Sequence, residues 1–501
     1  MQRFRFLVKR LLTLTTTNDT SPFYTGCNYS YQKQSPIMPM IYKKALAVNL
    51  MLVSSSIAIY AQYVQNNYFM ETAIMRHQSN PAFLLDDKYI TIPFLGNIHA
   101  NVSGNFGAST FIFNIDPATN NGYKWGTFMH PDVSNETFYD KLGKSDVRAF
   151  TMINYNVFSI SFNSFHGTNV IELNVRSNAA SNFPNELFRF AKEPTAKTDY
   201  DFVGLKARAQ AYTELALGHA HRINKNLTVG TKIKLLMGVA YANMDVEKLQ
   251  LKMAEDEWAV KGRINASAAI LNSHIALDQN GHFNAIKNMK AGLTGLGLAI
   301  DLGATYQLHQ VKGLEFSLAL NDIGYIRNKV QNFKPNKDLD WTFNGFKNAY
   351  VASDKENSQD VGTEFKQLGE DFKDLLRFQE TPEKEINAAL PMTLNIGAEY
   401  VMPFYKKMSI GLLHTQRIND LAEWHSTMLT ARVHPVKELE AALSTSVGTS
   451  HTCLGAAISL YCPGFSLILS SDQLLTKFSK QYIPINNVST NVTLGMGIPL
   501  K

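Results

Sequence analysis

An alternation of apolar and polar residues with a period of two runs through most of the chain and is clearest over residues 227–241. Side chains alternate across a β-strand, so such a stretch predicts a strand with one apolar face and one small or polar face. The same alternation predicts strands over 98–113, 148–154, 156–164, 169–177, 203–222 (one strand or two), 227–241, 243–253, 256–267, 294–308, 312–322, 391–401, 406–415, 424–433, 437–447, 452–461, 463–470 and 488–499. We therefore expect about 14 to 17 strand segments.

The apolar face carries no charge in the five clearest segments. These are 227–241, 296–308, 314–320, 394–402 and 492–500. Together they hold 29 positions in the apolar register, where the 18% charged content of the chain would place roughly five charges by chance. A charge facing the middle of a bilayer costs about 2–4 kcal/mol. The sequence therefore predicts an all-β protein, a transmembrane antiparallel β-barrel of about 14 strands.

The opposite register is polar but poor in long charged side chains, unlike a sheet face in water. A barrel lumen partly filled by its own chain explains this composition. We interpret its few charged residues as lumen charges, and its glycines as positions of close approach on an inner wall. The predicted lumen charges are Lys232, Lys234, Asp301, Glu315 and Glu399. The glycines are Gly230, Gly238, Gly297, Gly303, Gly397, Gly411, Gly495 and Gly497.

Residues 40–61 have the layout of a secretory signal peptide. Lys43 and Lys44 precede a short apolar core, and Ala61 stands at the cleavage position before Gln62. Residues 1–39 are then a non-structural extension upstream of the true start, or part of an unusually long leader. We expect export to the outer membrane of a Gram-negative cell.

Charge excludes a nucleic-acid partner. Residues 1–61 hold seven Lys/Arg and one acidic residue, which leaves 41 basic and 41 acidic residues in 62–501. A neutral mature chain lacks the basic footprint of a nucleic-acid-binding protein.

Three segments depart from the strand pattern. Residues 62–97, in which Asn80-Pro81-Ala82 ends a short helical stretch and 89–94 predict a short β run, precede the barrel proper at 98–501. Residues 185–192 predict a short helix, and 268–291 a polar insert. Residues 330–388 predict a large loop with one amphipathic helix at 365–378, because Phe and Leu recur there at helical spacing. That helix is a lumen plug, an extracellular lid, a partner-binding arm or a segment packed on its own barrel.

The sequence offers little chemistry. His219 and His221 share a strand face, but a strand end at the membrane interface explains them more simply than a metal pair. Cys453 and Cys462 flank one predicted strand and are a single disulfide or two small apolar residues. We find no Ser/His/acid set, metal-ligand spacing or cofactor motif, so we expect no catalytic, cofactor-binding or metal site and no enzyme.

Several motifs resemble those of an uncharacterised Bacteroidota outer-membrane β-barrel family, catalogued as a domain of unknown function. They are Asn80–Ala82, Ile92–Asn97, Gly297–Tyr306, Asn321–Arg327 and Pro463–Leu467, and the resemblance covers nearly all of 65–500. More distantly, the Asn-Pro-Ala opening is similar to that of long-chain fatty-acid transporters and of the type IX secretion barrel subunit. The transporter resemblance implies that residues 68–85 plug the lumen, and it carries over no ligand residue.

We expect a monomeric channel or transporter for small hydrophobic solutes. A non-transporting scaffold that docks secreted or surface proteins is the alternative, and a soluble periplasmic β-protein is a third. The expected partners are outer-membrane lipid and, with it, a hydrophobic small molecule or a secreted protein.

Overall fold

The computed structural model describes residues 65–500, apart from 86, 121, 256, 336–338, 344–376, 420, 422, 450–451 and 475–488. The chain divides into two units, Met1–Ala58 and Ile59–Lys501, and all described residues belong to the second. Ala61 and Gln62, with the predicted signal peptide and the 1–39 extension, lie outside the described residues. Within the described part, no helix is both long and apolar enough to cross a bilayer.

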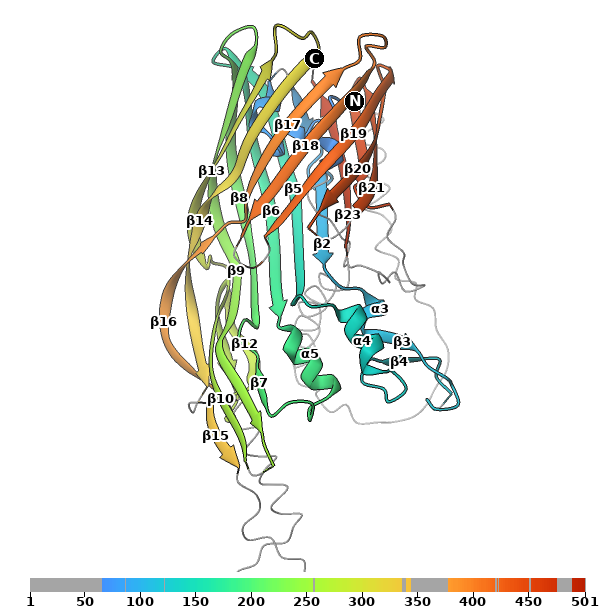
Figure 1. Cartoon of the computed structure of the whole chain (residues 1–501). Coiled ribbons are helices and arrows are strands. Elements are labelled where there is room, and N and C mark those ends of the chain that lie inside the picture. The colour runs from blue at the N-terminus through green and yellow to red at the C-terminus, as the bar shows by residue number, and fades with distance from the viewer. Residues whose placement is uncertain are drawn as a thin grey trace, which may run out of the picture. The chain divides into compact units, whose positions relative to one another are not determined.

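The main sheet closes into a 14-stranded antiparallel β-barrel (Figure 1), as the alternation predicts. Thirteen positions of the ring are single strands, and β1 (Tyr89–Thr91) and β2 (Asn97–Gly104) share the remaining one. In ring order these strands are β5 (Val147–Ser164), β6 (Gly167–Phe183), β8 (Lys206–Arg222), β9 (Leu227–Met253), β13 (Gly295–Gln307), β14 (Leu314–Pro335), β17 (Met392–Val401), β18 (Met408–Ile418), β19 (Trp424–Val436), β20 (Leu439–Gly448), β21 (Thr452–Cys462), β22 (Phe465–Ser471) and β23 (Ser489–Pro499).

The seam of the ring joins the two ends of the described chain. β1 and β2 both pair with β23 on one side and with β5 on the other. The break between them contains Phe94, whose positive φ of 63° turns the backbone out of the strand. β1 lies within the predicted 62–97 plug segment, so the segment that precedes the wall is shorter than expected.

Several neighbouring predicted segments are single strands in the structure. Residues 148–154 and 156–164 form β5, and 227–241 and 243–253 form the 27-residue β9. β-Bulges shift the alternation inside each of them, which makes one strand look like two. The bulge in β9 also turns Tyr241 inward, although the alternation predicts it on the outer face.

A sheet extension continues beyond the ring. There β9 leaves β13 and pairs with β10 (Trp258–Ile270), which in turn pairs with β15 (Leu339–Phe343). β14 pairs with β16 (Phe378–Ala389), and exposed Arg327–Glu385 and Lys329–Glu383 pairs, each at 2.5 Å, join the two strands.

The extension corrects the prediction of a loop over 330–388, because charged side chains hide the strand pattern on this exposed sheet. Phe378 begins β16 rather than ending a helix. The rest of the predicted helix at 365–376 lies outside the described residues. The polar insert at 268–291 is a hairpin of β11 (Asn272–Leu277) and β12 (Phe283–Lys290).

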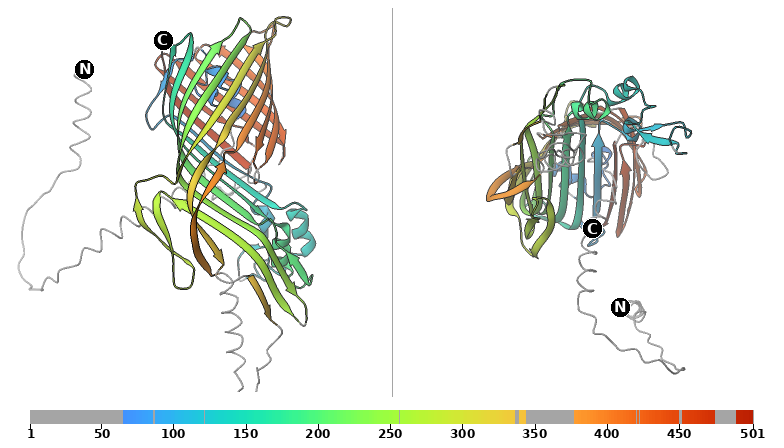
Figure 2. Two further views of the ribbon diagram at one scale, coloured as in Figure 1. Left: turned by 90° about the vertical axis from the view of Figure 1, so that its left-hand side faces the viewer. Right: turned by 90° about the horizontal axis from the view of Figure 1, so that it is seen from below.

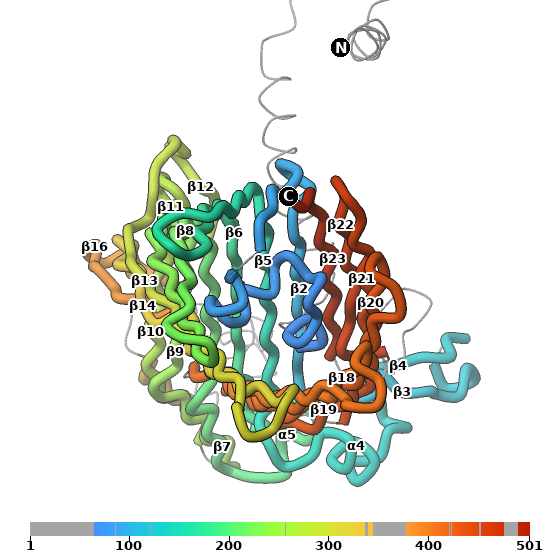
Figure 3. Tube along the Cα trace, turned by 90° about the horizontal axis from the view of Figure 1, so that it is seen from above, coloured from blue at the N-terminus to red at the C-terminus, as the bar shows by residue number. Residues whose placement is uncertain are grey.

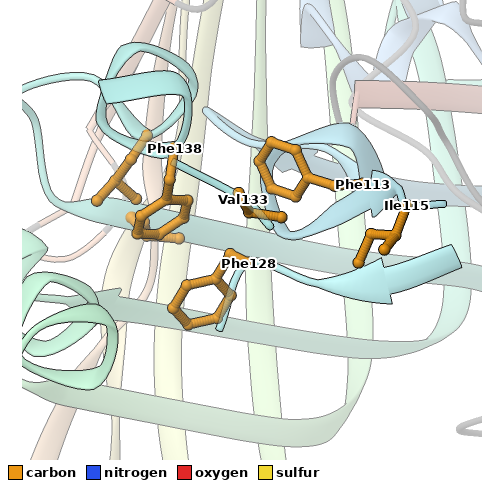
Figure 4. Close-up of a cluster of buried hydrophobic side chains, with 7 residues drawn as sticks. Phe113, Ile115, Phe128, Val133 and Phe138 are labelled. Atoms are coloured by element: carbon orange, nitrogen blue, oxygen red, sulfur yellow. The ribbon is translucent and has the colours of Figure 1, made fainter. Parts of the chain in front are cut away.

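A small cap lies at the same end of the ring as the extension (Figure 2). It contains α3 (Ala108–Phe111), the β3 (Ile112–Asn114) and β4 (Trp125–Thr127) hairpin, α4 (Asn135–Leu142) and α5 (Asn185–Lys192). The helix predicted at 185–192 is therefore present, whereas 98–113 ends as a strand at Gly104. Phe113, Phe128 and Phe138 build the core of the cap (Figure 4).

The two faces of the ring differ as the alternation requires. Ile233, Leu298 and Leu443 are each about 60% exposed on the outer face, and the strands beside them carry similar side chains. The turns at one end of the ring are short, such as 223–226 and 463–464, whereas the other end carries the cap and the extension.

Candidate functional site

The lumen contains the N-terminal residues 65–85 (Figure 3). They form three 3-10 turns, η1 (Gln65–Asn67), η2 (Arg76–Gln78) and η3 (Pro81–Leu84). Asn80 is extended and its Oδ1 accepts from the amide of Ala82 at 3.0 Å, while Pro81 occupies the first position of η3. An asparagine cap followed by proline favours the start of a helical turn. The asparagine side chain accepts a hydrogen bond from a free amide of the first turn, and proline has no amide hydrogen that would need a partner there. We call residues 65–85 the plug.

Glycines of the inner wall make room for the plug. A Cβ added at Gly230 of β9 would lie 2.3 Å from the carbonyl carbon of Pro81, and one at Gly303 of β13 would lie 2.1 Å from Asn80 Oδ1. A Cβ at Gly411 of β18 would lie 2.5 Å from the ring of Phe69. The backbone and rings of the plug therefore lie directly on the wall, which only glycine permits.

The wall between β18 and β22 meets the plug through apolar side chains. Tyr68, Phe69 and Phe83 pack with Leu413 and Met428. A second cluster is formed by Met70, Ala73, Ala442, Ala457 and Ile468. The plug and this wall therefore share two apolar patches, set among buried polar residues of the same strands such as Arg432 and Glu440.

Carboxylates and amides of the wall hold the backbone of the plug. Asp472 accepts from the amides of Gln65 and Asn66 at 2.7 and 3.0 Å. Glu440 accepts from the amides of Glu71 and Thr72 at 3.1 and 2.9 Å, and from the Thr72 hydroxyl at 2.5 Å. Asn321 and Asn395 both donate to the carbonyl oxygen of Ser79, at 2.8 and 2.9 Å. These bonds satisfy backbone groups that short turns leave free.

A buried ion cluster lines the wall formed by β6, β8, β9, β13 and β14. Lys232 lies 2.6 Å from Glu172, and Lys234 lies 2.6 Å from both Asp301 and Asp322. Arg176 lies 2.8 Å from Asp322 and 3.2 Å from Glu214, and so links these two carboxylates. The cluster contacts the plug because Gln78 donates to Glu172 at 3.1 Å. Charges buried this deeply are tolerated only when they are paired.

A second ion cluster is centred on Arg432 of β19. Its guanidinium lies 2.8 Å from Glu399, 2.8 Å from Glu440 and 3.2 Å from Glu71 of the plug. One arginine thus links two wall carboxylates to the plug. We call this set the Arg432 cluster.

The structure brings four of the five predicted lumen charges into these clusters. Lys232, Lys234 and Asp301 belong to the first and Glu399 to the second. Glu315 lies half-buried at the start of β14, where Gln307 donates to it at 3.2 Å. The partners Glu172, Arg176 and Glu214 were missed, although they share the inward register of their strands.

His77 of the plug is fully buried against the wall. Its Nε2 lies 2.5 Å from the hydroxyl of Tyr89, and the Lys232–Glu172 pair lies nearby. Burial, with a smaller contribution from Lys232, lowers the pKa of His77 to about 3. The imidazole is therefore neutral at ordinary pH.

The wall around β2 and β5, next to β23, is lined by buried asparagines. Among the described residues, no hydrogen-bond partner is within reach of either amide atom of Asn101 or of Oδ1 of Asn154 and Asn156. The lumen thus combines local apolar patches with walls rich in hydrogen-bonding groups.

The remaining candidates do not form a reactive site. The rings of His219 and His221 stack at 6.0 Å, and His219 Nδ1 lies 2.9 Å from Asn169 Oδ1. Cys453 and Cys462 are free and stand near opposite ends of β21, about 30 Å apart at the usual rise per residue, which rules out the disulfide.

Comparison with known proteins gives one family match. The model of a family of unknown function, DUF5723, matches residues 81–472. No curated protein matches the chain.

Solved barrels are similar at low identity. The toluene transporter TbuX of Ralstonia pickettii has 8% identity and a TM-score of 0.39, with 86% of this chain and 93% of that chain covered. The monoaromatic hydrocarbon channel CymD has 9% identity and a TM-score of 0.39, with 88% and 94% covered. A FadL homologue of Pseudomonas aeruginosa has 8% identity and a TM-score of 0.37, with 85% and 92% covered. Similarity at this level does not carry an argument about solute or mechanism.

Proposed function

Since the chain belongs to DUF5723, a family of unknown function, we propose its role from the geometry of its own lumen: an outer-membrane channel or transporter for small hydrophobic solutes. The observation that carries the proposal is the plug, which lies across the lumen of a closed ring and packs on two apolar patches of its wall. A solute that displaces part of these contacts would exchange one apolar surface for another at little cost.

The outer face supports a place in a membrane. It exposes aliphatic side chains around a closed ring, and a closed ring leaves no unpaired strand edge in hydrocarbon. Short turns face the periplasm in outer-membrane barrels and longer loops face outward. We therefore orient the cap and the sheet extension toward the cell exterior. An export signal at 40–61 and a Bacteroidota origin belong to the same proposal.

Plug movement is tested by a reversible lock. Thr72 Oγ1 of the plug lies 2.8 Å from Ser459 Oγ of β21, so Thr72→Cys with Ser459→Cys places two thiols within disulfide reach. Cys453→Ser and Cys462→Ser remove the other mature cysteines. Uptake of a radiolabelled monoaromatic hydrocarbon is then measured in cells that lack the wild-type gene and carry this variant.

We expect uptake to fall on oxidation and to recover on reduction. The matched control is the Thr72→Cys single variant in the same background, which cannot form the lock. If deletion of the gene leaves uptake unchanged for hydrocarbons and acyl chains alike, the transport proposal fails.

The scaffold alternative rests on a different observation. The cap has its own aromatic core and exposes Tyr123 and Trp125, each by more than 60%. Aromatic side chains are enriched where proteins bind partners. Co-purification of a secreted protein that is lost on Tyr123→Ser with Trp125→Ser, together with unchanged uptake, would favour the scaffold.

A further inference from the structure

Basic side chains gather on one face of the sheet extension. Lys248 of β9 lies directly opposite Arg263 of β10 in the strand register. Lys261 precedes Arg263 by two residues and so shares its face. Phe333 of β14 pairs with Ala266 of β10. The next pair along these antiparallel strands is Lys334 with Asn265, which lies on the same face of β10 as Lys261 and Arg263.

These four side chains line one groove. Its volume is about 520 Å³, and Asn265, Asp340 and Gln379 also line it. All four basic residues are exposed, so their charged ends are open to a ligand from solvent. The same face of β10 carries Ala269, which packs with Tyr241 and Val330, so the groove continues the inner wall of the ring.

The groove carries more positive than negative charge. Glu247, the extra residue of a β-bulge, lies 3.4 Å from Arg263 and accepts from Asn265 at 2.6 Å. Asp340 lies opposite Lys261 in the register. Among the described residues, no carboxylate lies within ion-pair distance of Lys248, Lys261 or Lys334. Four cations thus face two carboxylates.

This arrangement places like charges side by side in the absence of a ligand. Like charges directly opposite each other on neighbouring strands destabilise a sheet. The Lys248–Arg263 pair is such a contact, and Lys261 and Lys334 lie one position further along the same face. An anion that binds among them removes the repulsion as well as gaining hydrogen bonds.

We propose that this groove binds a ligand that carries two or more phosphate groups. Lysine and arginine donate charge-assisted hydrogen bonds to phosphate oxygens. Neighbouring strands lie about 4.8 Å apart, so cations spread over three strands span about 10 Å, more than one phosphate covers. The phosphorylated headgroup of an outer-leaflet lipid and a free polyphosphate share this chemistry. The inference goes beyond solute transport, since it requires only that the extension meet solvent.

The test uses the full chain in detergent, with inorganic tripolyphosphate titrated in a calorimeter. Flotation with vesicles that contain a bis-phosphorylated lipid, against vesicles of uncharged lipid, provides the second probe. The test variant is Lys248→Gln with Lys261→Gln. The matched control, Lys225→Gln with Lys312→Gln, makes the same charge change on exposed turn lysines at the other end of the ring.

We expect at least one probe to bind, with an affinity that falls as salt rises. The test variant should weaken binding by about tenfold or more, and the control by less than about twofold. Asp340→Asn should tighten binding, because it removes a carboxylate from the groove. The probe that binds identifies the source: tripolyphosphate alone indicates a free phosphate ligand, and vesicles alone indicate a lipid headgroup.

Two results overturn the inference. One is that neither probe binds the wild-type chain. The other is that the test and control variants weaken binding equally, which would show attraction to overall charge rather than to the groove. A heat-dependent gel shift for each variant shows that the barrel is folded, so loss of binding cannot be assigned to unfolding.

Discussion

Single glycines decide whether the plug can lie on the wall. Gly230→Ala would place a Cβ 2.3 Å from the Pro81 carbonyl carbon, so the plug backbone must shift. We expect this to weaken plug docking by about 1–3 kcal/mol. The yield of the Thr72–Ser459 cysteine lock under mild oxidation measures docking. The control is Thr231→Ala, on the neighbouring half-buried outward position, which should leave the yield unchanged. An unchanged yield for Gly230→Ala would contradict the contact.

His77 makes plug docking depend on pH. Its pKa is about 3 in the docked plug, below the ordinary value of 6.5, because the buried imidazole resists protonation. The released plug therefore binds a proton between these values and the docked plug does not. The contribution of His77 to docking is therefore full above pH 6.5 and falls as the pH falls toward 3, by at most about 1.4 kcal/mol per unit.

Protease cleavage within the plug, followed from pH 7.5 to 4.5, tests this dependence. His77→Asn should flatten the profile, although the Lys232–Glu172 pair beside it remains. Identical pH profiles for the wild-type chain and His77→Asn would rule out a contribution of His77 to the pH dependence of docking.

The alternation predicts the direction of a side chain only while the alternation is unbroken. It places Lys232, Lys234 and Asp301 inward because their strands are regular there, and it extends to Glu172 and Glu214. The alternation does not predict that Asp322 faces inward. Asp322 follows inward-facing Asn321, yet it is also buried, because its φ of 62° breaks the strand. Long-range pairing sets that geometry, and no local sequence signal reports it.

Strand β19 is joined to the plug by the side chain of Arg432. Arg432→Met leaves Glu71, Glu399 and Glu440 without their shared cation. Removing one partner of buried ion pairs costs about 3–5 kcal/mol. We expect a lower midpoint of thermal unfolding in detergent and a loose plug. Adding Glu399→Gln and Glu440→Gln should recover part of the loss, and no recovery would contradict the electrostatic explanation.

Strand prediction fails on elements whose two faces are both in water. β16 has Glu and Lys at successive positions and is held by backbone pairing and exposed ion pairs, so no apolar face marks it as a strand. The strands of the ring, by contrast, carry an apolar face that the period of two reveals.

The molecule as a whole should behave as a closed barrel. We expect it to bind detergent and to migrate faster on a gel before boiling than after, since a closed ring resists unfolding in detergent. Resistance to extraction from membranes by alkaline carbonate is the second measurement. A single band position together with carbonate extraction would contradict the membrane assignment and leave a soluble β-protein.

The seam has a consequence for biogenesis. Because β1 and β2 pair with β23, the ring stays open until the final strand has been delivered, and the plug is joined to β1 by only a few residues. Before closure, β2 and β23 each present an unsatisfied edge that invites aggregation. A chaperone that covers these edges before insertion, followed by closure of the ring around the plug in one step, would prevent such aggregation.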